Sequence, residues 1–365
     1  MRLPIFADRR YLPDRVPHFA LLYPFWGPSN DEAVSVNQDV FARFMHIGAE
    51  QFALTDLDEA RFAVFPAAWE RAEVTPAGRE RAEALAAEAA AHGKPMVVFF
   101  RSDYENPLNL PNSRIFRTSL TRSRRQPGEY VLPAWSADFV DSYCEGKLIL
   151  REKGARPVVG FCGDVSSGSS RWARAGRMLG ARPAIWRLAR RAGLELIRHP
   201  GSRLRLHALH YLSRSRDVVL NAVVRYGHWN RAVYRGQVLD PASVVQSRQE
   251  YAANMIESDY VLCARGKGNY SYRLYETLSC GRIPVLIDTD AVLPYEDWID
   301  WKQYVVWVEA DALHTIPERV AAFHARLSPA QFRDLQIACR QLWLDWLSPQ
   351  GFFGNLGRLD LREAH

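Results

Sequence analysis

The alternation of short apolar runs with helical stretches constrains the fold of this chain more than any other feature of its sequence. In the first half, the apolar runs at residues 18–23, 62–65 and 96–100 are predicted strands. Helical periodicity separates these runs at residues 36–49 and 76–92. Because strand, helix and strand follow one another in this way, the pattern predicts a parallel sheet with helices on both faces.

A second alternating unit begins with the apolar run at residues 157–161, after a polar linker at 151–154. Its expected helices are residues 170–192, 203–212, 241–257, 271–280, 317–327 and 329–347, and its expected strands are 194–198, 218–224, 260–264, 283–287 and 305–308. Residues 107–128 are rich in Pro, Asn, Ser and Arg and are expected to form a long irregular loop. We therefore expect an α/β fold with two parallel-sheet domains, residues 1–152 and 153–330, facing a cleft. A C-terminal helix, residues 331–365, is expected to pack back on the first domain.

Length and composition exclude several classes of protein. A chain of 365 residues is long enough for about two domains. It has no apolar run of the roughly 18 residues that a transmembrane helix needs, and it has no secretory signal at its start. The five cysteines are scattered in apolar segments, which is typical of a reducing compartment. These features predict a cytoplasmic protein.

Charge is distributed unevenly along the chain. The 47 Lys and Arg exceed the 41 Asp and Glu by six, yet residues 171–216 alone hold twelve arginines and one acidic residue. This segment predicts an anionic partner such as a membrane surface, a lipid diphosphate or an acidic polysaccharide; the alternative is a solvated face of Arg-rich helices. Nucleic acid is not expected, because no recognised nucleic-acid-binding motif accompanies the arginines. A second basic cluster lies in the expected loop: Arg114, Arg117, Arg122, Arg124 and Arg125.

The segment that follows the strand at 260–264 carries the clearest chemistry. It contains Gly266 and Gly268, which let the backbone approach a ligand closely, and it leads into a helix at Ser271, a plausible N-cap. The first amides of that helix favour an anion, and three cations lie around the same point: Arg265, Lys267 and Arg273. The combination predicts a diphosphate site that is neither a Walker loop nor a dinucleotide fingerprint.

Glu276 lies one helical turn after Arg273, on the same face. A carboxylate at this position could accept hydrogen bonds from both hydroxyls of a ribose. The alternative is an ordinary ion pair between Arg273 and Glu276 on the surface of the helix.

An ordered set of segments resembles the exostosin-like glycosyltransferases, family 47. The segments are residues 258–266, 271–278, 281–285, 293–295 and 300–301, with weaker similarity at 58–66 and 156–163. The resemblance implies a GT-B architecture of two Rossmann-like domains, an acceptor-side N-terminal domain and a C-terminal domain that holds a nucleotide sugar. It also implies inversion at the anomeric carbon, with Arg265 and Arg273 on the diphosphate and Glu276 on the ribose.

A further set of expectations follows from the resemblance. The acceptor would be a glycan or a lipid-linked oligosaccharide in bacterial surface polysaccharide synthesis. The lack of a membrane anchor and the basic segment 171–216 further predict that the enzyme works in the cytoplasm, in peripheral contact with the inner face of an anionic membrane. A departing nucleoside diphosphate could be stabilised by arginines and helix amides, so neither a metal nor another cofactor is expected.

Inverting transfer also needs a general base near the acceptor hydroxyl. Asp103, just after the strand at 96–100, is the first candidate, and Asp164, after the strand at 158–161, is the second. Asp56 and His46 come third. For each of these residues the alternative is an ordinary role in a loop or a helix cap.

Several other features give rival predictions. Asp288 and Asp290 form an Asp-x-Asp tripeptide after a strand, and their oxygens could hold Mn²⁺ or Mg²⁺ in a metal-dependent transferase. Asp56 and Asp58 form a second such tripeptide, and His207 with His210 share a helical face without a third ligand. A non-catalytic glycan- or membrane-binding protein of the same fold is a further alternative. Some of the eleven tryptophans could stack on sugar rings or form core: Trp298, Trp301, Trp343 and Trp346.

Overall fold

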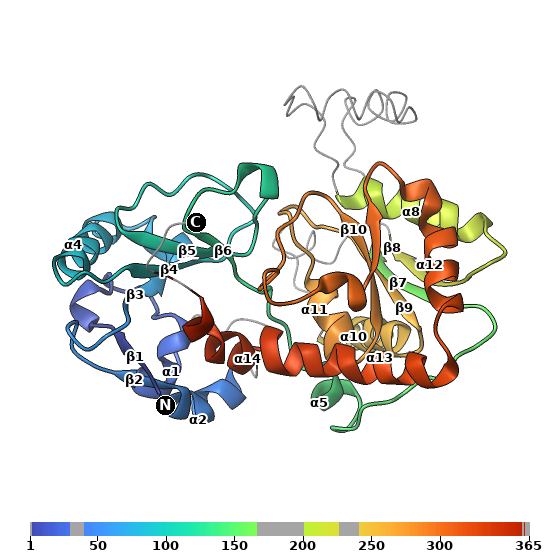
Figure 1. The fold of residues 1–365 in the computed structure, drawn as a ribbon, viewed down its shortest axis with the longest axis horizontal. Coiled ribbons are helices and arrows are strands. Elements are labelled where there is room, and N and C mark those ends of the chain that lie inside the picture. Colours follow the sequence, from blue (N-terminus) through green and yellow to red (C-terminus); the bar gives the residue numbers. More distant parts are fainter. Residues whose placement is uncertain (1, 30–39, 166–200, 226–240, 360, 362–365) are drawn as a thin grey trace.

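The computed structural model describes residues 2–29, 40–165, 201–225, 241–359 and 361. Within these residues the strands form two separate, all-parallel sheets, one of six strands and one of five, with helices packed against them (Figure 1). Two such sheets confirm the predicted α/β fold class and agree with a GT-B architecture.

The first sheet has the strand order β2-β1-β3-β4-β5-β6. Its strands are β1 (Leu3–Phe6), β2 (Phe52–Leu54), β3 (Phe62–Ala68), β4 (Met96–Phe100), β5 (Ser113–Arg117) and β6 (Glu129–Val131). Every residue of β3 and β4 is buried, because helices and connecting segments cover both faces of a parallel sheet. The helices of this part of the chain are α1 (Tyr23–Trp26), α2 (Ala42–Gln51), α3 (Trp69–Ala72), α4 (Gly78–Ala91) and α5 (Phe139–Tyr143).

The second sheet has the order β11-β10-β9-β7-β8. Its strands are β7 (Val158–Asp164), β8 (Val219–Arg225), β9 (Tyr260–Cys263), β10 (Ile283–Asp288) and β11 (Val306–Glu309). The described helices of this half are α8 (Gly201–Arg214), α10 (Pro241–Ile256), α11 (Tyr272–Ser279) and α12 (Ile316–Ala325). The chain builds outward from β7 to β8 and then returns to the other side of β7 with β9. Such a reversal opens a crevice at the carboxyl ends of the two strands, where ligands of open α/β sheets bind.

The end of the chain crosses from the second sheet to the first (Figure 1). Helix α13 (Pro329–Leu342) continues through a π-helical turn into α14 (Pro349–Gly354). The fully buried Phe353 of α14 packs against rings of the first sheet and its helices, with centroid distances of 4.6 Å to Phe44, 6.1 Å to Phe99 and 6.3 Å to Phe19. The last helix thus completes the core of the first sheet.

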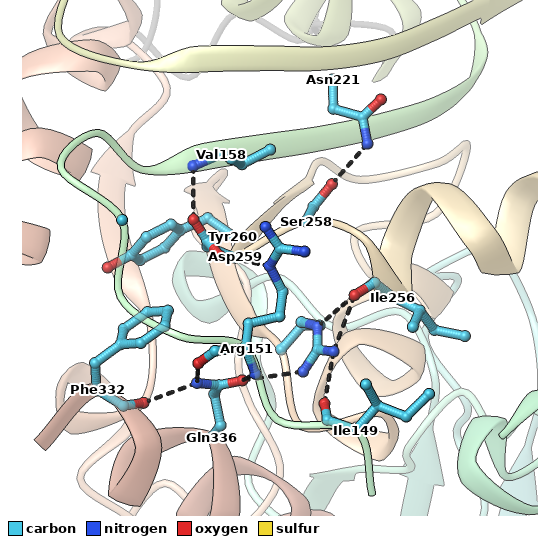
Figure 2. Close-up of polar contacts among 12 residues, drawn as sticks. Ile149, Arg151, Val158, Asn221, Ile256, Ser258, Asp259, Tyr260, Phe332 and Gln336 are labelled. Atoms are coloured by element: carbon cyan, nitrogen blue, oxygen red, sulfur yellow. Dashed lines mark hydrogen bonds and ion pairs between the residues drawn. The ribbon is translucent and has the colours of Figure 1, made fainter. Parts of the chain in front are cut away.

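A buried polar network fixes the connection between the sheets (Figure 2). Arg151 pairs with Asp259 at 2.6 Å, and the second carboxylate oxygen of Asp259 accepts from the backbone N–H of Val158 at 2.8 Å. Gln336 of α13 accepts from the N–H of Arg151 and donates to its carbonyl. The segment before β7 is therefore tied both to the start of β9 and to α13. The domain division at residues 152 and 153 remains a proposal.

Two sequence predictions about the first sheet are wrong. Residues 18–23 do not form a strand: Ala20–Leu22 is a 3₁₀ turn that leads into α1. The expected loop at 107–128 contains β5, in which Arg117 is buried and pairs with Glu129 of β6 at 3.0 Å. β5 has the basic composition of a loop because the charge of its Arg117 is neutralised by an ion pair with the neighbouring strand, which the local sequence does not reveal.

The predicted helix at 170–192 and strand at 194–198 lie outside the described residues, as does most of the basic segment 171–216. Over the ranges that the structure describes, no helix combines the length and the apolar character needed to cross a bilayer.

Candidate active site

Cationic side chains gather at the crevice between the carboxyl ends of β7 and β9. Arg205 of α8 donates to the carbonyl of Asp164, the last residue of β7, and to the carbonyl of Arg265, which follows β9, both at 3.1 Å. Burial, together with the neighbouring charge of Arg273, lowers the pKa of Arg205 to about 10. The buried Nε of Arg205 has no hydrogen-bond partner among the described residues. Arg205 and Arg273 thus place two positive charges close together, and a bound anion would reduce the repulsion between them.

Arg273, in the first turn of α11, reaches across the crevice to β7. Its Nη2 donates to the carbonyl of Cys162 at 2.7 Å, and its guanidinium lies 4.7 Å from the ring centroid of Phe161. Gly163 permits this approach, because a Cβ there would lie 2.9 Å from Nη2. Burial lowers the pKa of Arg273, but the neighbouring phenol of Tyr251 and other acidic groups outweigh it, so the net shift is upward. Arg273 is held in its charged form.

Glu276 and Arg273 do not form the ordinary surface ion pair that was the alternative. Glu276 is 7% exposed and accepts a hydrogen bond from the hydroxyl of Tyr251 at 2.5 Å, while Nε of Arg273 donates to the same hydroxyl at 3.3 Å. Burial raises the pKa of Glu276, and the hydrogen bond from Tyr251 opposes the rise. Its other oxygen, Oε1, accepts no hydrogen bond from the described residues, so it can accept one from a bound ligand.

The loop that connects β9 to α11 is a compact turn. The N–H of Gly266 donates to the carbonyl of Tyr270 at 3.0 Å, and Nη2 of Arg265 donates to the carbonyl of Lys267 at 2.9 Å. Among the residues that the structure describes, no atom lies within 4 Å of the position that a Cβ on Gly266 would take. Ser271 occupies the predicted N-cap position, but its side chain makes no capping hydrogen bond.

Asp103 from the first sheet lies directly against this loop. Its Oδ1 accepts from the N–H of Gly268 at 3.2 Å and from the hydroxyl of Tyr270 at 3.0 Å. Gly268 has to be glycine here, because an added Cβ would lie 2.9 Å from the Cα of Asp103. Next to it, Nζ of Lys267 donates to the hydroxyl of Tyr104 at 2.6 Å. The predicted base candidate and the predicted diphosphate loop are therefore in contact, although they are far apart in sequence.

Asn269 connects the β9–α11 loop to the first sheet. We call the contacts made here by Ser119, Thr121, Asn269 and Thr289 the seam between the two sheets. Its N–H donates to Ser119 at 2.7 Å, and its side-chain amide donates to Thr121 at 2.9 Å. Ser119 and Thr121 in turn donate to one oxygen of Glu105, at 2.7 and 3.0 Å. On the other side, the hydroxyl of Thr289 donates to Oδ1 of Asn269 at 2.6 Å. These buried contacts fix the loop that precedes α11 relative to the first sheet.

Several residues in or beside the site were not predicted from the sequence. Glu70 follows β3, and its two oxygens accept from the backbone N–H and Nε of Arg101, each at 2.9 Å. Burial raises the pKa of Glu70, and the charge of Arg101 opposes the rise. Glu70 and Arg101 each lie just after a strand. The strand predicted at 96–100 indicated the position of Arg101, but the strand predicted at 62–65 ended before the end of β3, so Glu70 was not recognised as following a strand. Arg205 and Tyr251 come from distant helices and left no local signal.

The remaining predicted candidates lie away from the crevice or contribute to contacts between the two sheets. Asp56 and His46 are exposed. Asp290 has a left-handed backbone, φ 65°; its carboxylate accepts from the N–H of Ser123 at 3.1 Å, and its own N–H donates to Asp288 at 2.8 Å. The described residues include no group of three or more His, Cys, Asp or Glu side chains placed to hold a metal ion. Asp288 and Asp290 thus brace the turn after β10 against the first sheet.

The residues from β8 to α12 show a clear similarity to a known family. Residues 219–323 match the Exostosin GT47 domain. This range contains Arg265, Arg273, Glu276 and Tyr251, four residues of the candidate site.

Curated relatives extend the similarity at low identity. Exostosin-1 of Drosophila melanogaster is 29% identical over 153 residues, which are 42% of this chain and 19% of that protein. The Exostosin-1 homolog of Caenorhabditis elegans is 32% identical over 137 residues, 37% of this chain and 34% of the relative. Exostosin-1c of Danio rerio is 30% identical over 117 residues, 32% of this chain and 16% of the relative. The chain therefore spans about a third or less of the length of these animal proteins, and the expected bacterial-type membership remains a prediction.

Proposed function

We propose that this chain is a glycosyltransferase that moves a sugar from a nucleotide-sugar donor to a glycan or lipid-linked acceptor. The observation that carries the proposal is the Arg273–Tyr251–Glu276 cluster at the crevice between β7 and β9, inside the range that matches the Exostosin GT47 domain. The match supports a glycosyltransferase domain, and the crevice is where open α/β sheets bind nucleotides.

In this proposal the diphosphate binds between Arg273 and the β9–α11 loop. Arg265, Lys267, the turn at Gly266 and Gly268, and the amides at the start of α11 after Ser271 would surround it. Oε1 of the buried Glu276 would accept a hydrogen bond from a ribose hydroxyl. As the bond between the sugar and the diphosphate breaks, negative charge grows on the leaving group. Fixed guanidinium groups and amides stabilise that charge without reorganising.

We propose Asp103 as the general base of an inverting transfer, with the first sheet on the acceptor side. Its Oδ1 is occupied by Gly268 and Tyr270, which hold the carboxylate against the donor loop, whereas Oδ2 accepts no hydrogen bond from the described residues. Oδ2 would remove the proton from the acceptor hydroxyl as that oxygen attacks the anomeric carbon. Asp164 at the end of β7 is the second candidate.

We further propose that the basic segment 171–216 contacts the inner face of an anionic membrane. In its described part Arg205 faces the crevice instead, so this arginine belongs to the proposed donor site.

Nucleotide binding tests the proposal first. Thermal unfolding is measured with UDP, GDP, CMP and their sugars, because a ligand that binds only the folded state raises the apparent Tm. Arg273→Lys should lose the shift, whereas Arg319→Lys, a matched change at the exposed Glu309 pair, should keep it. If no nucleotide raises the Tm of the wild-type chain, the donor site is wrong.

Turnover tests the proposal next. Release of nucleoside diphosphate in the presence of acceptor, with and without EDTA, separates a metal-independent transferase from a metal-dependent one. Nucleotide binding without any release would instead indicate a non-catalytic protein of the same fold.

A further inference from the structure

A solvent-open groove lies on the loop between β10 and β11, apart from the crevice of β7 and β9. Its volume is about 650 Å³, within the range of roughly 300 to 1,000 Å³ that is usual for ligand sites. None of its lining residues belongs to the segment 265–276. The segment between β5 and β6 contributes Arg122, and the loop after β10 contributes the residues on which the argument depends: Glu296, Asp297, Trp298, Asp300 and Lys302.

Trp298 distinguishes this groove, because tryptophan side chains are on average largely buried and this one is exposed. It is 53% exposed, whereas Trp301 is buried, with its indole N–H donating to the carbonyl of Pro294 at 3.1 Å. The guanidinium of Arg358 lies 5.9 Å from the ring centroid of Trp298 and 5.4 Å from that of Trp346. Arg358 thus contacts part of the indole of Trp298, and the exposed remainder of the ring is an apolar surface among polar lining residues.

The polar groups of the groove favour an uncharged ligand rich in hydroxyls. Arg122 is already paired with Glu296 through two contacts of 2.7 Å, so it offers little charge to an anion. Asp297 and Asp300 are exposed carboxylates, which accept hydrogen bonds from hydroxyls and repel anions. Lys302, which also lines the groove, supplies a hydrogen-bond donor.

The groove is linked to the donor loop through the seam. The backbone N–H of Arg122 donates to the carbonyl of Asp290 at 2.8 Å, two residues after the end of β10. The hydroxyl of the neighbouring Thr289 donates a hydrogen bond to Asn269, which lies in the β9–α11 loop. A chain of sugars in the groove would therefore contact Arg122, which is hydrogen-bonded to the turn that braces the donor loop.

We propose that this groove is a binding site for a neutral oligosaccharide, with the indole of Trp298 stacked on the apolar face of a sugar ring. Asp297, Asp300 and Lys302 would exchange hydrogen bonds with its hydroxyls. This inference rests on the proposed function in one respect: the oligosaccharide is the part of the acceptor that lies away from the reacting hydroxyl.

The test measures glycan binding in the absence of nucleotide. The tagged wild-type chain is applied to an immobilised array of neutral and uronic-acid-containing oligosaccharides. The neutral oligosaccharide with the strongest signal is then titrated by calorimetry. Two variants are compared with it: Trp298→Ala, and Tyr211→Ala as a matched change at an exposed aromatic residue of α8. Thermal unfolding of both variants confirms that they are folded.

We expect neutral oligosaccharides to bind, with a Kd that rises about tenfold or more in Trp298→Ala and stays unchanged in Tyr211→Ala. The absence of binding to any neutral oligosaccharide, preferential binding of acidic ones, or equal binding by Trp298→Ala would each overturn the proposal. Nucleotide binding is scored separately by the Tm shift. If nucleotides bind and glycans do not, the groove proposal alone fails; if glycans bind and nucleotides do not, the proposed donor site fails.

Discussion

Arg273 and Arg282 lie nine residues apart, and both donate to backbone carbonyls in the interior, yet we expect opposite consequences when each is changed to lysine. Arg273 faces the crevice, where its guanidinium contacts Cys162 and Tyr251. Arg282 is fully buried, and it donates to the carbonyls of Ile149, Ile256, Cys280 and Gly281 and to the side chain of Gln336. The same substitution thus separates a proposed ligand contact from a structural one.

The magnitudes follow from the contacts. Lysine keeps the charge but has three donors on a single nitrogen and cannot reproduce a planar fork. In Arg282→Lys about two buried carbonyls lose their donor, at about 1 to 3 kcal/mol each, so the free energy of unfolding should fall by about 2 to 6 kcal/mol. Arg273→Lys leaves about one carbonyl unsatisfied, so its free energy of unfolding should fall by about 1 to 3 kcal/mol. Its activity should fall about 100-fold, the typical effect of removing one donor to a developing charge.

Urea unfolding and nucleoside diphosphate release per folded molecule are measured on both variants. We expect Arg273→Lys to be folded and nearly inactive, and Arg282→Lys to be destabilised and active per folded molecule. If Arg273→Lys keeps its activity per folded molecule, the assignment of Arg273 to the leaving group is refuted.

Three further predictions concern the site, the seam and the core. Glu276→Gln should weaken nucleoside diphosphate binding about tenfold by calorimetry, because a ribose contact to a charged acceptor becomes neutral, while the Tm changes little; unchanged affinity would contradict the ribose contact. Asn269→Ala removes two side-chain donor bonds, to Thr121 and to the carbonyl of Thr289, and one acceptor from a buried seam and should cost about 2 to 4 kcal/mol in urea unfolding, whereas Arg122→Gln breaks a half-exposed pair and should cost less than about 1 kcal/mol; similar losses in the two variants would show that the seam is not held by Asn269. Phe353→Ala should cost about 3 to 5 kcal/mol by the same measurement, since it empties a fully buried aromatic site, and a loss below 1 kcal/mol would mean that α14 is dispensable for the first sheet.

The fold was predictable from sequence wherever burial on both faces leaves a continuous apolar run. β3, β4, β9 and β10 are of this kind, and their positions agree with the predictions. β5 was missed because Arg117 needs a partner in β6 that the local sequence does not reveal.

The site was predictable only where its residues are close in sequence. The spacing of Arg273 and Glu276 placed both on one face of α11, but the residue that joins them, Tyr251, comes from α10. Asp103 was chosen because it follows a strand; its contacts with Gly268 and Tyr270 span 165 and 167 residues and depend on how the two sheets meet. Periodicity carries no information about such contacts.

The insertion of Phe353 into the first sheet has a consequence for the order in which the protein is made. The last strand of that sheet ends at Val131, but the ring that fills its core against Phe44 and Phe99 is synthesised 222 residues later. At about 5 to 20 residues per second, a ribosome needs roughly 10 to 45 seconds to cover that distance. During this interval the amino-terminal half emerges with an apolar hollow that nothing fills. The nascent chain should therefore be a chaperone client until translation is nearly complete, and a messenger that ends before the codon for Phe353 would yield a product prone to aggregation rather than a smaller working domain.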